Sequence, residues 1–247
     1  MDAPTEDHVL NGRVRLLQPV RGYRAGLDAA LLAAACDATS GQRVLEAGCG
    51  AGGVLLAAAS RCPDVHFTGV ERDPNALGLA HQNIASNGFT SRVEAIEGDV
   101  GVRFSALGLE PFDAAMTNPP FFDDSSTLRG PAPERRAAWM ADDGLAAWIA
   151  FLSKGVREGG TITLIHRADR LADILALLGE KCGGVQVRPI HPFADAPAKR
   201  VLVRAIKTGK APLRLLPALI LHDHGGEKHR PEVEAILRGE AALDWLA

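Results

Sequence analysis

Short apolar runs alternate with longer alanine- and leucine-rich stretches along most of the chain. The short runs, rich in β-branched side chains, predict strands over 43–47, 65–70, 92–96, 112–117, 160–166, 184–190 and 200–206. The longer stretches predict helices over 52–60, 74–86, 141–156 and 168–180, with a weaker one over 101–107. Strands that alternate with helices form right-handed crossovers. We therefore predict a doubly wound, seven-stranded, mostly parallel sheet with helices on both faces. Because no helix separates the last two strands, one of them should pair antiparallel to its neighbours.

Each end of the chain adds a helix to this alternating pattern. The first lies near 28–37, with Asp28 as its expected N-cap, and the last lies near 231–245, with Pro231 in its first turn. No internal repeat or low-complexity tract divides the chain. We expect a single domain, 1–247, made of an N-terminal extension over 1–40, a core over 41–207 and a C-terminal extension over 208–247.

A glycine-rich loop follows the first strand of the alternating pattern. The segment "VLEAGCGAGGVLLAAA" places glycines at 48, 50, 52 and 53 between that strand and its helix. Such a loop lets the backbone approach a ligand closely and directs helix N–H groups toward it. The spacing also fits the GxGxxG pattern of dinucleotide-binding folds. An NAD-type oxidoreductase and a non-catalytic nucleotide-binding protein are therefore two interpretations of the loop.

Acidic residues at three strand ends favour a different ligand. Glu46 ends the first strand, where a carboxylate repels a pyrophosphate but attracts an ammonium or sulfonium cation. Glu71 ends the second strand and can accept from both hydroxyls of a ribose, while Asp99 follows the third strand and can accept from an exocyclic adenine amine. With "LEAGCGAG", this combination resembles the class I S-adenosylmethionine-dependent methyltransferases, which share a seven-stranded sheet with an antiparallel last strand.

The resemblance implies S-adenosylmethionine as cofactor and S-adenosylhomocysteine as product. It implies cofactor contacts from the glycine loop and the acidic strand ends, namely Glu46, Gly48, Cys49, Gly50, Gly52, Glu71, Arg72, Asp99 and Val100. Tyr23 and Asp28 are expected to approach the cofactor from the N-terminal segment, and helix capping is the alternative role for these two residues.

The sequence "TNPPFF" follows the fourth strand, at the edge where doubly wound sheets bind ligands. A planar amine is a poor nucleophile because its lone pair is delocalised. The Asn118 side-chain oxygen and the Pro119 carbonyl can accept both amine protons and so localise the lone pair. Pro119 and Pro120 stiffen the loop, and Phe121 offers a face for a flat base. We therefore predict a catalytic clamp of Asn118, Pro119, Pro120 and Phe121, with Asn118 also beside the cofactor.

An N-P-P-aromatic motif resembles methyltransferases that act on exocyclic amines of adenine or guanine, and those that act on the glutamine amide of release factors. The stretches "RGYRAGLDAALLAAA" and "RVLVRAIKTGKAPLRLLPALILHD" resemble the bacterial tRNA (adenine-N6) methyltransferases that modify the adenine beside the anticodon of a valine tRNA. This resemblance implies a tRNA partner. Guanine N2 of rRNA and a protein glutamine amide remain alternatives. The residues expected to contact RNA are Phe122, Lys199, Arg200, Lys207 and Lys210.

Composition narrows the class of protein without naming a substrate. Of 247 residues, 47% are hydrophobic and 23% are charged, which is typical of a globular protein. The apolar runs are shorter than the roughly 20 residues of a membrane span, and the acidic start "MDAPTEDH" is unlike a signal peptide, so we expect a cytoplasmic protein with no membrane partner. The net charge of −3 gives no sign of RNA, although basic residues gather over 199–214. His222, His224 and His229 are interpreted as a solvated loop, and no metal is expected.

Overall fold

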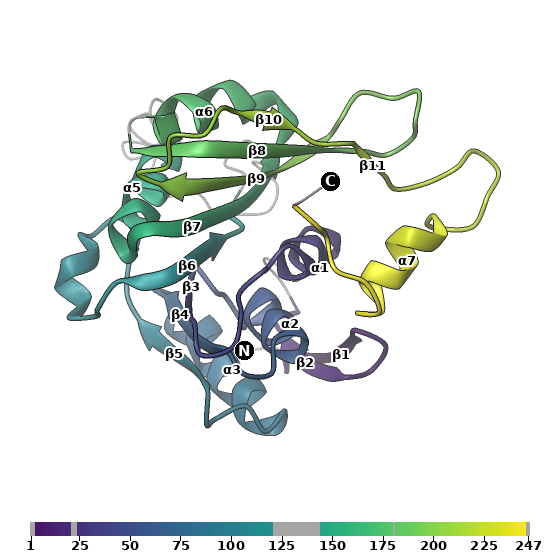
Figure 1. Cartoon of the computed structure of the whole chain (residues 1–247). Helices are drawn as coiled ribbons and strands as arrows, with labels where there is room; N and C mark the ends of the chain where they lie inside the picture. The colour runs from purple at the N-terminus through teal and green to yellow at the C-terminus, as the bar shows by residue number, and fades with distance from the viewer. Residues whose placement is uncertain (1–2, 21–23, 121–143, 180, 246–247) are drawn as a thin grey trace, which may run out of the picture.

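The computed structural model describes residues 3–20, 24–120, 144–179 and 181–245, and it has a central sheet with helices on both faces (Figure 1). The strands are β1 Thr5–Val9, β2 Val14–Gln18, β3 Arg43–Ala47, β4 His66–Glu71, β5 Val93–Glu97, β6 Phe112–Thr117, β7 Val156–Arg167, β8 Cys182–His191, β9 Arg200–Lys207, β10 Arg214–Leu215 and β11 Leu219–Ile220. The helices are α1 Leu27–Ala34, α2 Gly53–Arg61, α3 Pro74–Ser86, the 3-10 turn η1 Phe104–Leu107, α5 Leu145–Gly155, the 3-10 turn η2 Ala168–Arg170, α6 Leu171–Gly179 and α7 Pro231–Leu237.

The large sheet has the order β10-β8-β9-β7-β6-β3-β4-β5, and β11 pairs with β8. β3 runs parallel to β4 and β6, and β6 runs parallel to β7. β9 lies between β7 and β8 and is antiparallel to both. The predicted doubly wound, mostly parallel sheet with an antiparallel last strand is therefore confirmed. The two-residue strands β10 and β11 lie alongside β8 and raise the sheet to nine strands; they are too short to give a periodic signal in the sequence.

Two hydrophobic cores, one on each face of the sheet, hold these layers together. α1, α2, α3 and α7 contribute to the first core, which contains Leu32, Leu55 and Ile236. α5, α6 and η1 contribute to the second core, which contains Leu152, Leu178 and Phe104. Strand residues on both faces are buried because helices cover both sides of the sheet, as expected for parallel strands joined by helical crossovers.

An N-terminal hairpin of β1 and β2 was not among the predicted elements. The two strands pair antiparallel, with Thr5 opposite Gln18, and form a sheet of their own. Leu10, Asn11 and Gly12 have positive φ in the turn between them. Asn-Gly is a strong hairpin signal, so the turn chemistry could have located this element.

Two predicted helix features are wrong. The N-cap of α1 is Gly26 rather than Asp28, whose carboxylate instead accepts a hydrogen bond of 2.8 Å from Arg200 Nε. The last helix ends at Leu237, not near 245, because Gly239 adopts a φ of +75° and its amide donates to the Ile236 carbonyl, which ends the helix in a left-handed turn. None of the helices in the described part of the chain has the length and apolar character that a membrane crossing requires.

Candidate active site

The ends of the parallel strands bring the predicted site residues together. Thr117, the last residue of β6, is the register partner of Ala47, the last residue of β3, and its hydroxyl donates a hydrogen bond of 2.9 Å to the Ala47 carbonyl. Asn118 and Gly48 are therefore the first residues to leave two adjacent strands at the same edge of the sheet. The sequence predicted this convergence from the alternation of strands and helices.

A pocket opens at this edge between the glycine loop, the N-terminal segment and the end of β6. Glu46, Gly48, Cys49 and Asn118 are predicted site residues that line it. Among the described residues, the lining consists of Gln18, Ala25, Glu46, Gly48, Cys49, Ala51, Gly53, Val54 and Asn118.

Positive φ angles and close packing explain the glycines of the loop. Gly48 has a φ of +69°, and a Cβ added to it would lie 2.3 Å from Trp148 Cη2 of α5. Gly50 has a φ of +56° and Gly52 one of +87°, so the backbone here is in a region that disfavours other residues. Gly52 is the N-cap of α2, so the first amides of this helix point toward the loop.

Glu46 is a buried acid whose charge is not balanced by a cation among the described residues. Its side chain is 2% exposed, and Oε2 accepts no hydrogen bond from any residue that the structure describes. Burial raises the pKa of Glu46 well above its usual value, the Leu55 amide in the first turn of α2 opposes this rise, and the Glu71 carboxylate adds to it. A positively charged ligand in the pocket would favour the ionised form.

The Cys49 thiol is not set up as a nucleophile. It is 5% exposed, and its pKa is raised well above the usual value by burial, and then by the carboxylates of Glu46 and Glu71. The thiol is therefore protonated at neutral pH and packs as a small apolar group beside the pocket.

Glu71 supports the glycine loop from the end of β4. Its Oε2 accepts from the Gly50 amide at 2.9 Å, while Oε1 accepts from the Arg72 and Asp73 amides at 2.9 and 2.8 Å. Oε1 therefore accepts two bonds and Oε2 accepts one, so that one of about four lone-pair sites, on Oε2, is left for a ligand.

Asp99 and Val100 follow β5, one strand further along. Asp99 Oδ2 lies 3.6 Å from Arg72 Nη1, and Asp99 Oδ1 accepts from the Gly101 amide at 2.8 Å. Val100 packs against the second core. None of the residues Glu71, Arg72, Asp99 and Val100 lines the pocket described above, so they form a separate part of the same sheet edge.

The structure describes three of the four residues of the predicted clamp, Asn118, Pro119 and Pro120. Pro119 is buried and Pro120 is half-buried, so the loop leaving β6 packs against the protein. Phe121, Phe122 and Tyr23, which were predicted to contact the base, the RNA and the cofactor, lie outside the described residues.

The described residues predicted to contact RNA lie at two edges of the sheet. Lys199 and Arg200 lie at the start of β9, which runs antiparallel to β7, so they share the edge of the sheet with Asn118. Lys207 ends β9 at the opposite edge, where its ammonium donates to the Val156 carbonyl at 2.7 Å, and Lys210 follows it there. A strand of this length separates its ends by about 25 Å at roughly 3.3 Å per residue. The described basic residues of this group thus lie at two edges of the sheet, and their contact with RNA stays a prediction.

Ala51, Gly53 and Val54 of the lining follow the predicted loop residues closely in sequence, whereas Gln18 and Ala25 were not predicted because no local motif marks them. Gln18 is 3% exposed, donates to Asp7 Oδ2 at 2.7 Å and accepts from the Ala25 amide at 2.6 Å. Ala25 in turn packs on the glycine loop, because a Cβ added to Gly53 would lie 2.3 Å from the Ala25 Cβ. The hairpin and the residues after it thus form one wall of the pocket.

The three histidines of the 222–229 loop have different partners. His222 Nδ1 contacts the Lys228 carbonyl, His224 Nε2 lies 3.0 Å from Asp195 Oδ1, and His229 Nδ1 lies 2.7 Å from Glu234 Oε1. Across the described ranges, no three His, Cys, Asp or Glu side chains are grouped as a metal site.

Comparison with known proteins identifies the class. Residues 24–130 match the family described as the methyltransferase small domain. The crystal structure of a predicted O-methyltransferase from Agrobacterium tumefaciens superposes with a TM-score of 0.76 at 28% sequence identity, covering 89% of this chain and 100% of that chain. With the mostly parallel sheet and its glycine loop, these similarities define a class I S-adenosylmethionine-dependent methyltransferase. Enzymes of this class take their methyl group from S-adenosylmethionine, and the oxidoreductase interpretation of the loop is set aside.

Sequence relatives identify the family within that class. A tRNA1(Val) (adenine(37)-N6)-methyltransferase from Aeromonas hydrophila is 34% identical over 185 residues, which cover 73% of this chain and 75% of the relative. The chain belongs to the family of these tRNA1(Val) (adenine(37)-N6)-methyltransferases. A Porphyromonas gingivalis enzyme of the same name is 34% identical over 158 residues, 61% of each chain. A release factor glutamine methyltransferase from Chlorobaculum tepidum is 28% identical over 165 residues, 64% of this chain and 56% of the relative. The chain thus spans less than two thirds of the length of these last two relatives.

Proposed function

We propose that the protein transfers a methyl group from S-adenosylmethionine to the exocyclic amine of a nucleic-acid base, with N6 of a tRNA adenine as the substrate. The observation that carries this proposal is that Glu46 and Asn118 line the same pocket at the ends of adjacent parallel strands. Glu46 suits a cationic methyl donor, and Asn118 suits a planar amine.

The pocket chemistry fits a sulfonium cofactor. Glu46 has a buried oxygen that accepts no hydrogen bond from the described residues, and an ammonium or sulfonium charge would offset the desolvation of its ionised form. Gly48, Gly50 and Gly52 let the loop backbone approach the ligand closely. Glu71 Oε2 has a lone pair left for a ribose hydroxyl after the carboxylate has accepted from three backbone amides.

The acceptor side needs hydrogen-bond acceptors rather than a strong base. Asn118 Oδ1 and the Pro119 carbonyl would accept the two protons of the amine, so that its lone pair points at the methyl group. As the new C–N bond forms, the bond between the methyl group and sulfur would break and S-adenosylhomocysteine would leave, and the nitrogen would become acidic enough to release one proton to water. The buried Pro119 limits the motion of the loop and keeps the two acceptors in place.

Adenine in tRNA is favoured over the other planar amines by the family and by the charges at the site edge. Lys199 and Arg200 lie at the same edge of the sheet as Asn118, where they can contact phosphates. A glutamine amide presents a similar planar NH2 group, and the Chlorobaculum tepidum relative acts on one by name. The substrate test must therefore include a protein acceptor.

Methyl transfer to isolated substrates tests the proposal. Wild-type protein, Asn118→Ala and Asn75→Ala are incubated with labelled S-adenosylmethionine and either unmodified tRNA or a release factor, and the products are digested and identified. Asn75 is exposed in the first turn of α3 and provides the same change of residue outside the pocket that Asn118 lines. We expect N6-methyladenosine from the wild type and Asn75→Ala, and a rate lower by about 100-fold or more with Asn118→Ala. Label in glutamine but not in tRNA would reject the base as substrate, and equal rates for the two variants would reject the clamp.

A further inference from the structure

We propose that Asn83 is a positioning residue that links the N-terminal hairpin to the glycine loop, so that hairpin docking and cofactor binding stabilise each other. The inference rests on the proposed function only in taking S-adenosylmethionine and its product as the ligands of the pocket. It concerns a residue that lies outside the glycine loop and the clamp.

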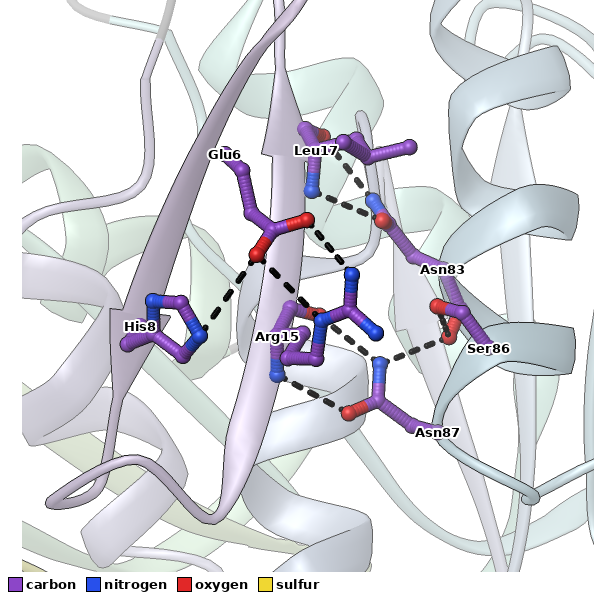
Figure 2. A network of polar contacts seen from close by, with 7 residues as sticks. All are labelled: Glu6, His8, Arg15, Leu17, Asn83, Ser86 and Asn87. Atoms are coloured by element: carbon purple, nitrogen blue, oxygen red, sulfur yellow. Dashed lines mark hydrogen bonds and ion pairs between the residues drawn. The ribbon is translucent and has the colours of Figure 1, made fainter.

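The Asn83 side chain joins two segments far apart in the sequence. It lies on α3 and is fully buried, with 0% exposure. Its amide nitrogen donates to the carbonyls of Leu17 and Ala51, both at 2.9 Å, and its oxygen accepts from the Leu17 amide at 2.8 Å. Both N–H groups of the Asn83 amide therefore donate, one to a carbonyl on β2 and one to a carbonyl on the glycine loop. Figure 2 shows the pair of bonds to Leu17 between α3 and β2.

Asn87, the C-cap of α3 and four residues after Asn83, provides a natural comparison. Its oxygen accepts from the Arg15 amide at 2.9 Å and its nitrogen donates to the Arg15 carbonyl at 2.7 Å (Figure 2). The two asparagines thus satisfy the edge of β2 that β1 does not cover. Asn87 contacts the hairpin and its own helix, whereas Asn83 also contacts the loop.

Both segments that Asn83 joins line the cofactor pocket. The hairpin supplies Gln18, whose side chain holds the amide of Ala25, another lining residue. The loop supplies Ala51, whose carbonyl is the one that Asn83 binds. One amide therefore fixes the distance between two walls of the pocket.

A ligand that orders the loop must then favour the docked hairpin. Once the Ala51 carbonyl is held in place by the ligand-bound loop, the Asn83 amide is fixed in the orientation that also binds Leu17. Linkage is reciprocal, so a docked hairpin must raise the affinity for the ligand by the same factor. Without the Asn83 amide, the polar groups of Leu17 and Ala51 lose their partner and this coupling is lost.

Calorimetric titration with S-adenosylhomocysteine compares wild type, Asn83→Ala and Asn87→Ala. We expect Asn83→Ala to raise the Kd about tenfold, within the usual range of such couplings, and Asn87→Ala to change it less than twofold. Both variants loosen the hairpin, so a purely structural role would lower the Tm of both without separating their affinities. Equal rises in Kd would overturn the inference.

Amide hydrogen exchange supplies a second test, which stays decisive if Asn83→Ala folds poorly. In the wild type, saturating S-adenosylhomocysteine should slow exchange of the Arg15 and Leu17 amides, and in Asn87→Ala it should still slow exchange at Leu17. If the wild type binds the ligand but exchange of these amides is not slowed, the inference is overturned and the proposed function is not. A wild type that fails to bind S-adenosylhomocysteine would overturn the proposed cofactor site and, with it, the coupling.

Discussion

Replacing Gly48 with alanine should destabilise the protein through two separate effects. Its φ of +69° costs a residue with a Cβ about 1–2 kcal/mol. The new Cβ would also lie 2.3 Å from Trp148 Cη2 and 2.7 Å from Cζ3, and forcing a methyl group into a packed ring costs about 1–3 kcal/mol. The lower entropy of the unfolded alanine chain offsets about 0.4–1 kcal/mol. We expect the free energy of unfolding to fall by about 3 kcal/mol.

Gly50→Ala is the matched control because it has only the first of these costs. Gly50 has a φ of +56°, and nothing lies within 4 Å of an added Cβ, so we expect a loss of about 1 kcal/mol. Urea unfolding of both variants gives the two free energies. A double-mutant cycle of Gly48→Ala with Trp148→Leu isolates the contact with the ring. If the two glycine variants lost the same stability, the close packing of Trp148 on the loop would be refuted.

Two further predictions concern charge. Burial raises the pKa of Glu46, so between the unfolded value of about 4.3 and that pKa the native state binds the extra proton, and the contribution of Glu46 to wild-type stability falls as pH rises. Glu46→Gln cannot ionise, so its stability relative to the wild type should rise by up to about 1.4 kcal/mol per pH unit across that window; a pH-independent difference in urea unfolding would contradict this. At the site edge, Lys199→Glu should weaken tRNA binding about tenfold and reduce its salt dependence, whereas Lys210→Glu, at the opposite edge, should have a smaller effect. Equal losses of affinity in the two variants would count against our placement of the RNA.

The sequence predicted the arrangement of the sheet because that arrangement follows from local signals. Glu46, Glu71 and Asn118 stand at the ends of apolar runs that alternate with helices. Runs that alternate with helices favour parallel strands, whose carboxyl ends meet at one edge of the sheet. The predicted neighbours Glu46 and Asn118 therefore lie in the same pocket.

Errors at the ends of the chain have local and non-local causes. The Asn-Gly turn of the hairpin and the left-handed Gly239 that ends α7 are signals present in the sequence. The sequence does not indicate the role of Asp28. Its carboxylate could accept hydrogen bonds either from the first amides of its own helix or from a distant guanidinium. Only the position of β9 decides that it binds Arg200.

By itself, the sequence determined which segments form the strands β3 to β9, where the glycine loop and the Asn-Pro-Pro segment lie, and that both follow strands at one edge of the sheet. These features depend on residues close together in the chain. Only the tertiary structure decided that Gln18 and Ala25 complete the pocket and that Asn83 joins them to the loop. It also decided that Lys199 and Lys210 lie at opposite edges of the sheet. Hydrogen bonds and burial between distant segments depend on how the layers pack, and no short stretch of residues specifies that packing.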